Sequence, residues 1–490
     1  MRLNRPLPNA RARPKHRSTR RCVHAGSSVP TPLDLISSPD PALWTRMVDL
    51  SSLLPTSVHQ FNTLNPGSEI KLMAKCEHMN PGMSHKDRIA KSMLERAEKR
   101  GELRGPNGEK KTILAASSGN TGDLRLLSVR PRVVLPRILF GPALFGLGPA
   151  LFGPALFGLV PRPARPRVVR PHRLITHQSS ARHLQRSCPH ARLAGCSLAL
   201  VGTLMGYDVS IITNAKCSSE KCCHIRSNGA TLWLAESLGE EFPDVIGKEK
   251  DYMKQEDLLV EAYPDRFFSV NQYGNVDNME AHYGSTGMEI WEQTNGEVSH
   301  FVMAGSTGGT IMGVGRYLKE KSAGVQIVLA DPEKSHLSAL VAGRSDAAAG
   351  DAAFKEIDAK IKATGGIQVE GAGKASLTGL MTQGGGVLSH VDEAISINDF
   401  DAFDHSRAAG AAGMLVGGSA GLNIAASKVL AQRCAEETPR AGGVTIVTLL
   451  CDHGIKYLSK VYNDEWLAKH DTRPPAPAGG NADGHVLRAR

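Results

Sequence analysis

The feature that most constrains the fold of this chain is an alternation of short apolar runs with longer amphipathic runs from residue 70 onward. A short apolar run suits a buried strand, whereas a longer amphipathic run suits a helix that covers one face of a sheet. Strands and helices in alternation predict an α/β fold of stacked layers with parallel strands. The expected strands are residues 112–116, 208–213, 230–235, 300–304, 325–330 and 444–450.

The positive charge of the chain limits its partners. Of 490 residues 41% are hydrophobic, and the net charge is +10. Residues 1–33 hold seven Arg, one Lys and no acid, and residues 123–195 hold twelve Arg, no Lys and one Asp, so the remainder is acidic. We therefore expect no nucleic-acid partner. Gly and Pro interrupt the longest apolar tract, residues 138–160, so we expect no transmembrane helix and no membrane partner.

The two ends of the chain differ from its body. Residues 1–35 are rich in Arg among Ala, Ser and Pro, which is typical of a transit peptide for a mitochondrion or a plastid. The alternative is a basic tail or an upstream extension of the reading frame, which would leave the protein in the cytoplasm. Residues 471–490, with several Pro and Gly, are expected to form a disordered tail.

The cysteines indicate neither a disulfide framework nor a metal site. Their number is nine, which is odd, and they are scattered. Cys217, Cys222 and Cys223 form the one cluster, and it lacks the second pair of ligands that a zinc site needs. We therefore expect helix residues there and no metal.

Lys86 is the first candidate for chemistry. It lies in Asn-Pro-Gly-Met-Ser-His-Lys-Asp-Arg at 80–88, where Ser84 can cap a helix after a tight turn. A lysine presented in the first turn of a helix can form a Schiff base with an aldehyde. For a lone lysine, an exposed helix position would be the better interpretation.

Two loops of small residues follow expected strands. Residues 117–122, Ser-Ser-Gly-Asn-Thr-Gly, let backbone amides approach an anion and suit a carboxylate, although a structural turn is an alternative. Residues 305–310, Gly-Ser-Thr-Gly-Gly-Thr, precede a helix and suit a phosphate. The second loop lacks the Walker lysine, which disfavours a nucleoside triphosphate.

A serine completes the set. Ser419, in Gly-Gly-Ser-Ala-Gly at 417–421, could hydrogen-bond a neutral pyridine nitrogen. An amine, two anion loops and this hydroxyl are the contacts that a pyridoxal phosphate enzyme needs. A neutral ring is a weaker electron sink than a protonated one, so Ser419 favours β-elimination and β-replacement.

Residues 123–195 are foreign to this pattern. They repeat Gly-Pro-Ala-Leu-Phe-Gly at 141, 148 and 153 and are rich in Arg and Pro, which suits neither strand nor helix. Joining Gly122 to Cys196 restores a small-residue turn that runs into an apolar helix. Codons at both junctions can hold GT and AG in one phase, so the segment is interpreted as a translated intron, with a real insertion as the alternative.

With these motifs in order, the chain resembles the fold-type II pyridoxal phosphate enzymes, and within them the cysteine synthase and cystathionine β-synthase family. The resemblance covers about residues 50–468 without the insert. It implies a tryptophan synthase β-like catalytic domain at 45–468, with two three-layer α/β subdomains and the cofactor between them. The smaller subdomain would span about 72–122 plus 196–240, and the remainder would form the larger one.

The resemblance also assigns roles. Lys86 would bind the cofactor and remove the α-proton of the substrate. The other cofactor contacts would be Asn120 for the hydroxyl, Ser306, Thr307, Gly308, Gly309 and Thr310 for the phosphate, and Ser419 for the ring nitrogen. The substrate carboxylate would be held by Ser117, Ser118, Thr121 and Gln272.

The implied reaction is loss of acetate from O-acetyl-L-serine, followed by attack of sulfide on an aminoacrylate intermediate to give L-cysteine. Condensation of serine with homocysteine, as in cystathionine β-synthase, is the nearest alternative, and a serine or threonine dehydratase is a more distant one. Met83, His85, Ser306 and Val276 depart from the residues that the family more often has.

The resemblance further implies a homodimer and, in some members, a serine acetyltransferase partner. An inactive, misspliced or partner-binding homologue is the alternative from another class, because the insert interrupts the loop at 117–122.

Overall fold

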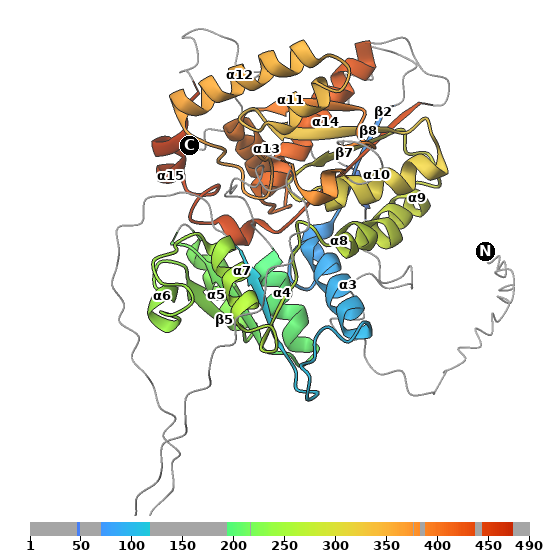
Figure 1. Ribbon diagram of the computed structural model, residues 1–490. Helices are drawn as coiled ribbons and strands as arrows, with labels where there is room; N and C mark the ends of the chain where they lie inside the picture. The colour runs from blue at the N-terminus through green and yellow to red at the C-terminus, as the bar shows by residue number, and fades with distance from the viewer. Residues whose placement is uncertain are drawn as a thin grey trace, which may run out of the picture.

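Two mainly parallel sheets organise the protein. The computed structural model describes residues 47–49, 70–117, 194–215, 217–375, 377–382, 388–436 and 443–473. One sheet has six strands in the order β1-β2-β10-β7-β8-β9, and the other has four in the order β5-β4-β3-β6. Figure 1 shows the four-stranded sheet and its helices below the six-stranded sheet and its helices. The prediction of a layered α/β fold is confirmed.

All six expected strands are present to within two residues at each end. The strands are β1 (Met47–Asp49), β2 (Ile70–Lys75), β3 (Thr112–Ala116), β4 (Val209–Thr213), β5 (Thr231–Leu234), β6 (Phe267–Ser269), β7 (His300–Ala304), β8 (Gln326–Pro332), β9 (Glu393–Ile397) and β10 (Val444–Leu449). Among them β1 alone is antiparallel, and it pairs with β2.

The helices alternate with the strands. They are α3 (Lys86–Lys99), α4 (Ala194–Leu204), α5 (Ser219–Ser227), α6 (Leu238–Glu241), α7 (Tyr252–Ala262), α8 (Val276–Ala281), α9 (Met288–Gln293), α10 (Gly309–Lys321), α11 (Leu337–Ala342), α12 (Ala347–Thr364), α13 (Asp399–Ala411), α14 (Gly418–Glu436) and α15 (Asp464–His470). A π-helical turn, His282–Gly287, joins α8 to α9, and 3-10 turns lie at Glu77–Met79, Gly379–Thr382 and Gly454–Tyr457. No helix of the described part is long and apolar enough to cross a membrane.

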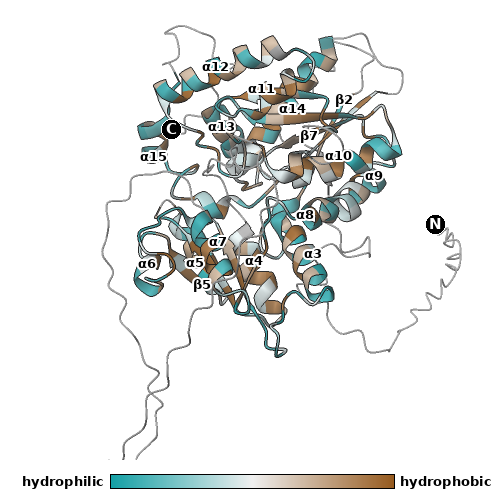
Figure 2. Cartoon of the chain, viewed as in Figure 1, coloured by the Kyte–Doolittle hydropathy of each residue, from teal (hydrophilic) through white to brown (hydrophobic). Residues whose placement is uncertain are grey.

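Each sheet is the middle layer of three. In the six-stranded sheet, Leu72 and Val302 face a core shared with α13 and α14, while Phe301 and Leu329 face a core shared with α10 and α11. The central strands β7 and β10 are buried along their whole length, which explains why their sequences are mainly apolar and do not alternate strictly between apolar and polar residues. Figure 2 shows hydrophobic strand ribbon inside the six-stranded sheet, whereas α6 and parts of α12 on the outside are hydrophilic.

The smaller sheet is built in the same way. Ile113 and Ile211 face a core that includes Met93 of α3 and Leu198 of α4. Leu114 and Ile212 of the same strands point to the opposite core, which α6 and α7 complete. The alternation of side chains along a strand therefore gives two apolar layers from one sheet.

The boundaries of the smaller subdomain differ from those expected at 72–122 plus 196–240. Strand β2 pairs with β10 and so belongs to the larger sheet, while β6 pairs with β3 and extends the smaller one to Ser269. A three-residue strand is too short to leave a periodic pattern in the sequence. Helix α4 begins at Ala194, so the last two residues of the expected insert are helical.

Several expected segments lie outside the described residues. They are the whole of 1–35, residues 123–193 of the insert and all but the first three residues of the tail 471–490.

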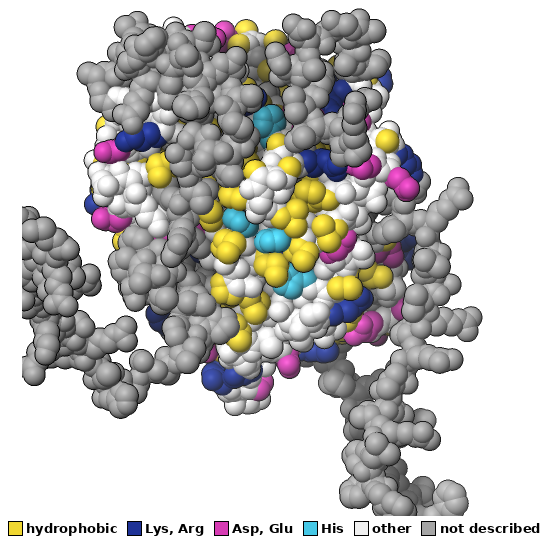
Figure 3. Space-filling model, turned by 180° about the vertical axis from the view of Figure 1, so that it is seen from behind, with side chains coloured by type: hydrophobic (Ala, Val, Ile, Leu, Met, Phe, Trp, Pro, Cys, Tyr) yellow, Lys and Arg dark blue, Asp and Glu magenta, His cyan; other side chains and the backbone are white. Residues whose placement is uncertain are grey.

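On the face opposite to that of Figure 1, the described surface gathers hydrophobic and histidine side chains at its centre, with charged side chains mainly toward its margins (Figure 3).

Candidate active site

The candidate site lies where parallel strands end. The loops after β2, β7 and β10 leave the same edge of the larger sheet, because the carboxyl ends of parallel strands share one edge. These loops carry Lys86, the small-residue stretch 305–310 and the segment Leu450–His453. Residue Ser117 follows β3, at the carboxyl edge of the smaller sheet. Most of the residues chosen from sequence thus come from strand ends.

The segment Leu450–His453, here called the β10 extension, joins two of these parts. On one side, the backbone N–H of His85 donates to the carbonyl of Cys451 at 2.9 Å. On the other side, the backbone N–H of Gly417 donates to the carbonyl of Asp452 at 2.9 Å. Ser84 and Val416 form bridges to Asp452 and His453. The extension therefore fixes the turn before Lys86 relative to the start of α14.

Lys86 begins α3 and is buried, with 8% of its surface exposed. Burial lowers the pKa of its amine to about 8, although Cys451 and Asp452 act in the opposite direction. Among the described residues, no side chain or carbonyl accepts a hydrogen bond from Nζ. The amine is thus more often neutral near pH 7 to 8 than an exposed lysine, as a nucleophile must be.

The loop at Gly305–Thr310 has the geometry of an anion cradle. Gly308 has φ +88°, and a Cβ atom at Gly309 would collide with the Asn278 side chain. Within the described part of the chain, the backbone N–H groups of Ser306, Thr307, Gly308 and Thr310 donate no hydrogen bond, and α10 starts at Gly309. Unused amides at the N-terminus of a thirteen-residue helix suit a phosphate.

Side chains behind the cradle hold it in place. The amide of Asn278 donates to the carbonyl of Gln272 at 2.8 Å and to Oγ1 of Thr307 at 3.4 Å. The hydroxyl of Thr378 donates to the carbonyl of Thr307 at 2.6 Å. Sequence reasoning did not single out Asn278 or Thr378, because neither lies in a small-residue motif.

His282 is a further residue of the site, and the sequence analysis gave it no role. Its Nε2 lies 3.1 Å from Oγ1 of Thr310, and its Nδ1 lies 2.9 Å from Oγ1 of Thr286. Burial, with help from His85 and Lys86, lowers its pKa well below the ordinary value. A neutral His282 thus connects the cradle to the π-helical turn.

Ser419 lies in the first turn of α14 and is 2% exposed. Its buried Oγ has no hydrogen-bond partner among the described residues by distance and angle. The hydroxyl does lie near enough to the Cys451 thiol to oppose the effect of burial on the pKa of that thiol. Burial raises the pKa of Cys451 to about 12. A buried hydroxyl with no partner is costly unless a ligand atom meets it, so this position fits the ring nitrogen expected there.

The carboxylate loop is described only in part. Ser117 is buried, its N–H donates to the carbonyl of Ile212 at 2.8 Å, and it packs against Gly195, where a Cβ atom would lie 2.8 Å from its Oγ. Gln272 is also buried, next to the phosphate cradle through Asn278. Ser118, Asn120 and Thr121 lie outside the described residues.

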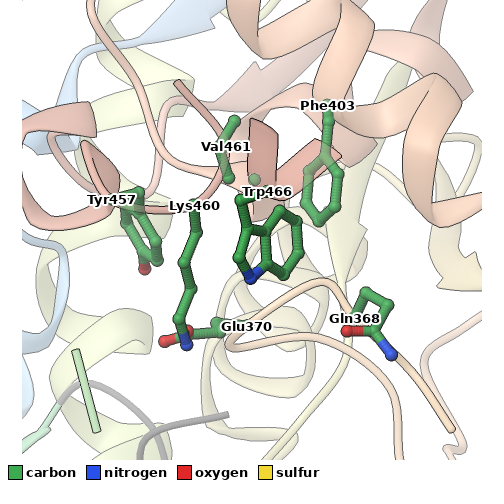
Figure 4. A pocket seen from close by; sticks show the side chains of 8 residues that line it. Gln368, Glu370, Phe403, Tyr457, Lys460, Val461 and Trp466 are labelled. Atoms are coloured by element: carbon green, nitrogen blue, oxygen red, sulfur yellow. The ribbon is translucent and has the colours of Figure 1, made fainter. Parts of the chain in front are cut away.

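A buried ion cluster connects the two sheets beside the site. Glu370 accepts from Lys221 of α5 and, at 2.8 Å, from Lys460. Burial would raise the pKa of Glu370, but the two lysines outweigh burial and lower it to about 2. Figure 4 shows Lys460 reaching toward Glu370 in a pocket that Tyr457 and Trp466 also line. The Lys221–Glu370 pair therefore ties the smaller sheet to the larger one.

Comparisons with known proteins agree with this geometry. A family model described as pyridoxal-phosphate dependent enzyme matches residues 51–124 and 194–452. A cysteine synthase of Dictyostelium discoideum is 27% identical over 85% of this chain and 84% of that protein. The cystathionine beta-synthase of Rattus norvegicus is 26% identical over 82% of this chain but 52% of that protein. The crystal structure of O-acetyl serine sulfhydrylase isoform 3 from Entamoeba histolytica superposes with a TM-score of 0.57, 25% identity and coverage of 94% and 95%.

The anion cradle can be tested with one methyl group. In Gly309→Ala the added Cβ collides with Asn278 and distorts the loop, so we expect the affinity for pyridoxal phosphate to fall by about ten-fold or more. Gly324→Ala is the matched control, because the nearest atom to its Cβ is Ser322 Oγ at 4.0 Å. Fluorescence titration of the cofactor-free protein measures both. Equal affinities for Gly309→Ala and the unchanged protein would contradict the assignment of the cradle.

The lowered pKa of Lys86 makes a second prediction. Below its pKa the amine is protonated and does not react, so its labelling by an amine-reactive reagent should rise with pH around a midpoint near 8. Mass spectrometry of peptides from the cofactor-free protein gives the profile for each lysine. A midpoint near 10.5, the ordinary value for lysine, would show that the amine is not buried in this way.

Proposed function

Because the chain belongs to the family of pyridoxal-phosphate dependent enzymes, we propose that it forms L-cysteine from O-acetyl-L-serine and sulfide by β-replacement. The observation that carries the proposal is a buried amine of lowered pKa, Lys86, placed at the β10 extension together with the buried hydroxyl of Ser419, which has no hydrogen-bond partner in the described part of the chain. Relatives named cysteine synthase, 26% to 27% identical over most of both chains, support it.

The protein groups would divide the work as follows. Pyridoxal phosphate, when bound, supplies an electron-withdrawing ring that makes the α-hydrogen of an amino acid acidic and lets a β-substituent leave. The cradle amides of Ser306, Thr307, Gly308 and Thr310 would hold its phosphate, and Ser419 would donate a hydrogen bond to its ring nitrogen. A serine cannot protonate that nitrogen as a carboxylic acid would, which limits the ring to milder chemistry such as β-replacement.

Lys86 has two roles in this proposal. Its amine would hold the aldehyde carbon of the cofactor, and its Nζ would take the α-proton of the substrate. A pKa near 8 leaves enough of the neutral base at physiological pH. The substrate carboxylate would be held by Ser117 and Gln272 together with Ser118 and Thr121, which lie outside the described residues.

The segment 123–195 is proposed to be foreign to the working enzyme. The family model matches the chain up to residue 124 and again from residue 194, which supports this reading. In the structure Gly195 packs against Ser117 at the start of α4, and removal of 123–195 would place Gly122 directly before Cys196. The full chain would then hold the cofactor but bind the substrate carboxylate weakly, because the loop between Ser117 and α4 is interrupted.

A form without residues 123–195 tests the function. We expect it to make cysteine from O-acetylserine and sulfide about ten-fold or more faster than the full chain, because the amides that hold the carboxylate are restored. Lys86→Ala in the shorter form is the control and should make none. Cysteine is quantified after a fixed time with both substrates in excess.

Other outcomes separate the proposals. Equal rates for the two forms would overturn the proposed effect of residues 123–195 and leave the reaction standing. A shorter form that binds the cofactor yet makes cystathionine from serine and homocysteine, and no cysteine, would replace the proposed substrates.

A further inference from the structure

The turn before Lys86 contains a backbone conformation that its residue does not favour. Met83 has φ +58°, in the left-handed region where glycine is the usual residue. Its side chain therefore opposes the conformation that the turn requires. Some interaction in the folded protein must hold Met83 in place, since strain of this kind persists only where the surroundings impose it.

A buried ammonium group meets this turn. Nζ of Lys456, a residue 1% exposed in the 3-10 turn Gly454–Tyr457, donates to the carbonyl of Gly82 at 2.8 Å and to that of Met83 at 3.1 Å. The backbone N–H of His453 donates to the same Met83 carbonyl at 3.1 Å. Two consecutive carbonyl groups of the turn thus point to one cation.

The amide side of the turn is held as well. The N–H of Gly82 donates to Oδ2 of Asp87 at 2.6 Å, and the Oδ1 of the same carboxylate accepts from Ser197 of α4 at 2.5 Å. Burial raises the pKa of Asp87 to about 6, with Lys456 acting in the opposite direction. Asp87 thus accepts from a backbone N–H of the turn before Lys86, while Lys456 donates to two of its carbonyl groups.

We propose that Lys456 is a positioning residue that holds Met83 in its left-handed conformation and so aims Lys86 at the cofactor. Among the described residues Lys456 makes no ion pair within 4.0 Å, and its Nζ donates to those two carbonyl groups alone. The inference rests on the proposed role of Lys86. It assigns to Lys456 no contact with substrate or cofactor.

Four variants test the inference: Lys456→Met, Lys456→Arg, Met83→Gly and the double variant Lys456→Met with Met83→Gly. We expect Lys456→Met to bind pyridoxal phosphate about ten-fold or more weakly, because two charge-assisted hydrogen bonds are lost. Glycine adopts a positive φ without strain, so Met83→Gly should restore most of the affinity in the double variant. Lys456→Arg keeps a donor cation and should stay close to the unchanged protein.

Controls separate positioning from simple loss of stability. Lys334→Met removes another buried lysine, 3% exposed and 4.0 Å from Asp399, and should leave cofactor affinity unchanged. The pH profile for labelling Lys86 is a second readout. If Lys456 acts by positioning, the pH midpoint of Lys86 labelling in Lys456→Met should be unchanged and the labelling rate at high pH should be lower. If Lys456 acts through its charge, the midpoint should move.

The result that overturns the inference is a Lys456→Met variant with unchanged affinity, or one whose loss Met83→Gly does not reduce. If Lys456→Met does not fold, the cofactor affinities of Lys456→Arg and Met83→Gly test the inference instead. A large loss of affinity in Met83→Gly alone would contradict the proposal that Met83 is held in a strained conformation. Failure of the proposed role of Lys86 would be recognised separately, because the cofactor would then be found on a different lysine in the unchanged protein.

Discussion

The site depends on the hydrogen bonds that the β10 extension makes on both of its sides. Cys451 and Asp452 accept, through their carbonyl groups, from His85 and from Gly417. These are buried backbone groups, whose loss without a replacement partner is costly, so the bonds hold the turn before Lys86 and the start of α14 against the extension. The lysine of α3 and the serine of α14, more than 300 residues apart in sequence, are thereby placed at one strand end.

Burial then decides the chemistry of the side chains that meet there. It lowers the pKa of Lys86 to about 8 and keeps His282 neutral, so the site offers a free amine and an uncharged imidazole. The charged side chains buried nearby are paired. Glu370 pairs with Lys221 and Lys460. Arg88 pairs with Glu77 and Glu289 through short contacts. The cation of Arg88 lies two residues after Lys86, so breaking this cluster would disturb the helix that presents the amine.

Much of this arrangement follows from sequence patterns. Central parallel strands leave mainly apolar runs in the sequence, and the loops of small residues after them are easily recognised. For this reason Lys86, Gly308, Gly309 and Ser419 could be chosen. The features that the sequence analysis missed also have physical reasons. β6 is too short for periodicity, and β2 changes subdomain because its partner, β10, lies far away in sequence. Asn278, Thr378 and Lys456 act through hydrogen bonds to residues distant in the sequence, and no local sequence pattern predicts such bonds.

The most direct test of the account identifies the lysine that holds the cofactor. The full-length protein is saturated with pyridoxal phosphate, reduced with borohydride and digested, and the modified peptide is located by mass spectrometry. The account predicts a pyridoxyl group on Lys86, the one lysine of the described chain that combines burial, a lowered pKa and a place beside both Ser419 and the β10 extension. Modification of another lysine, with Lys86 unmodified, would contradict it.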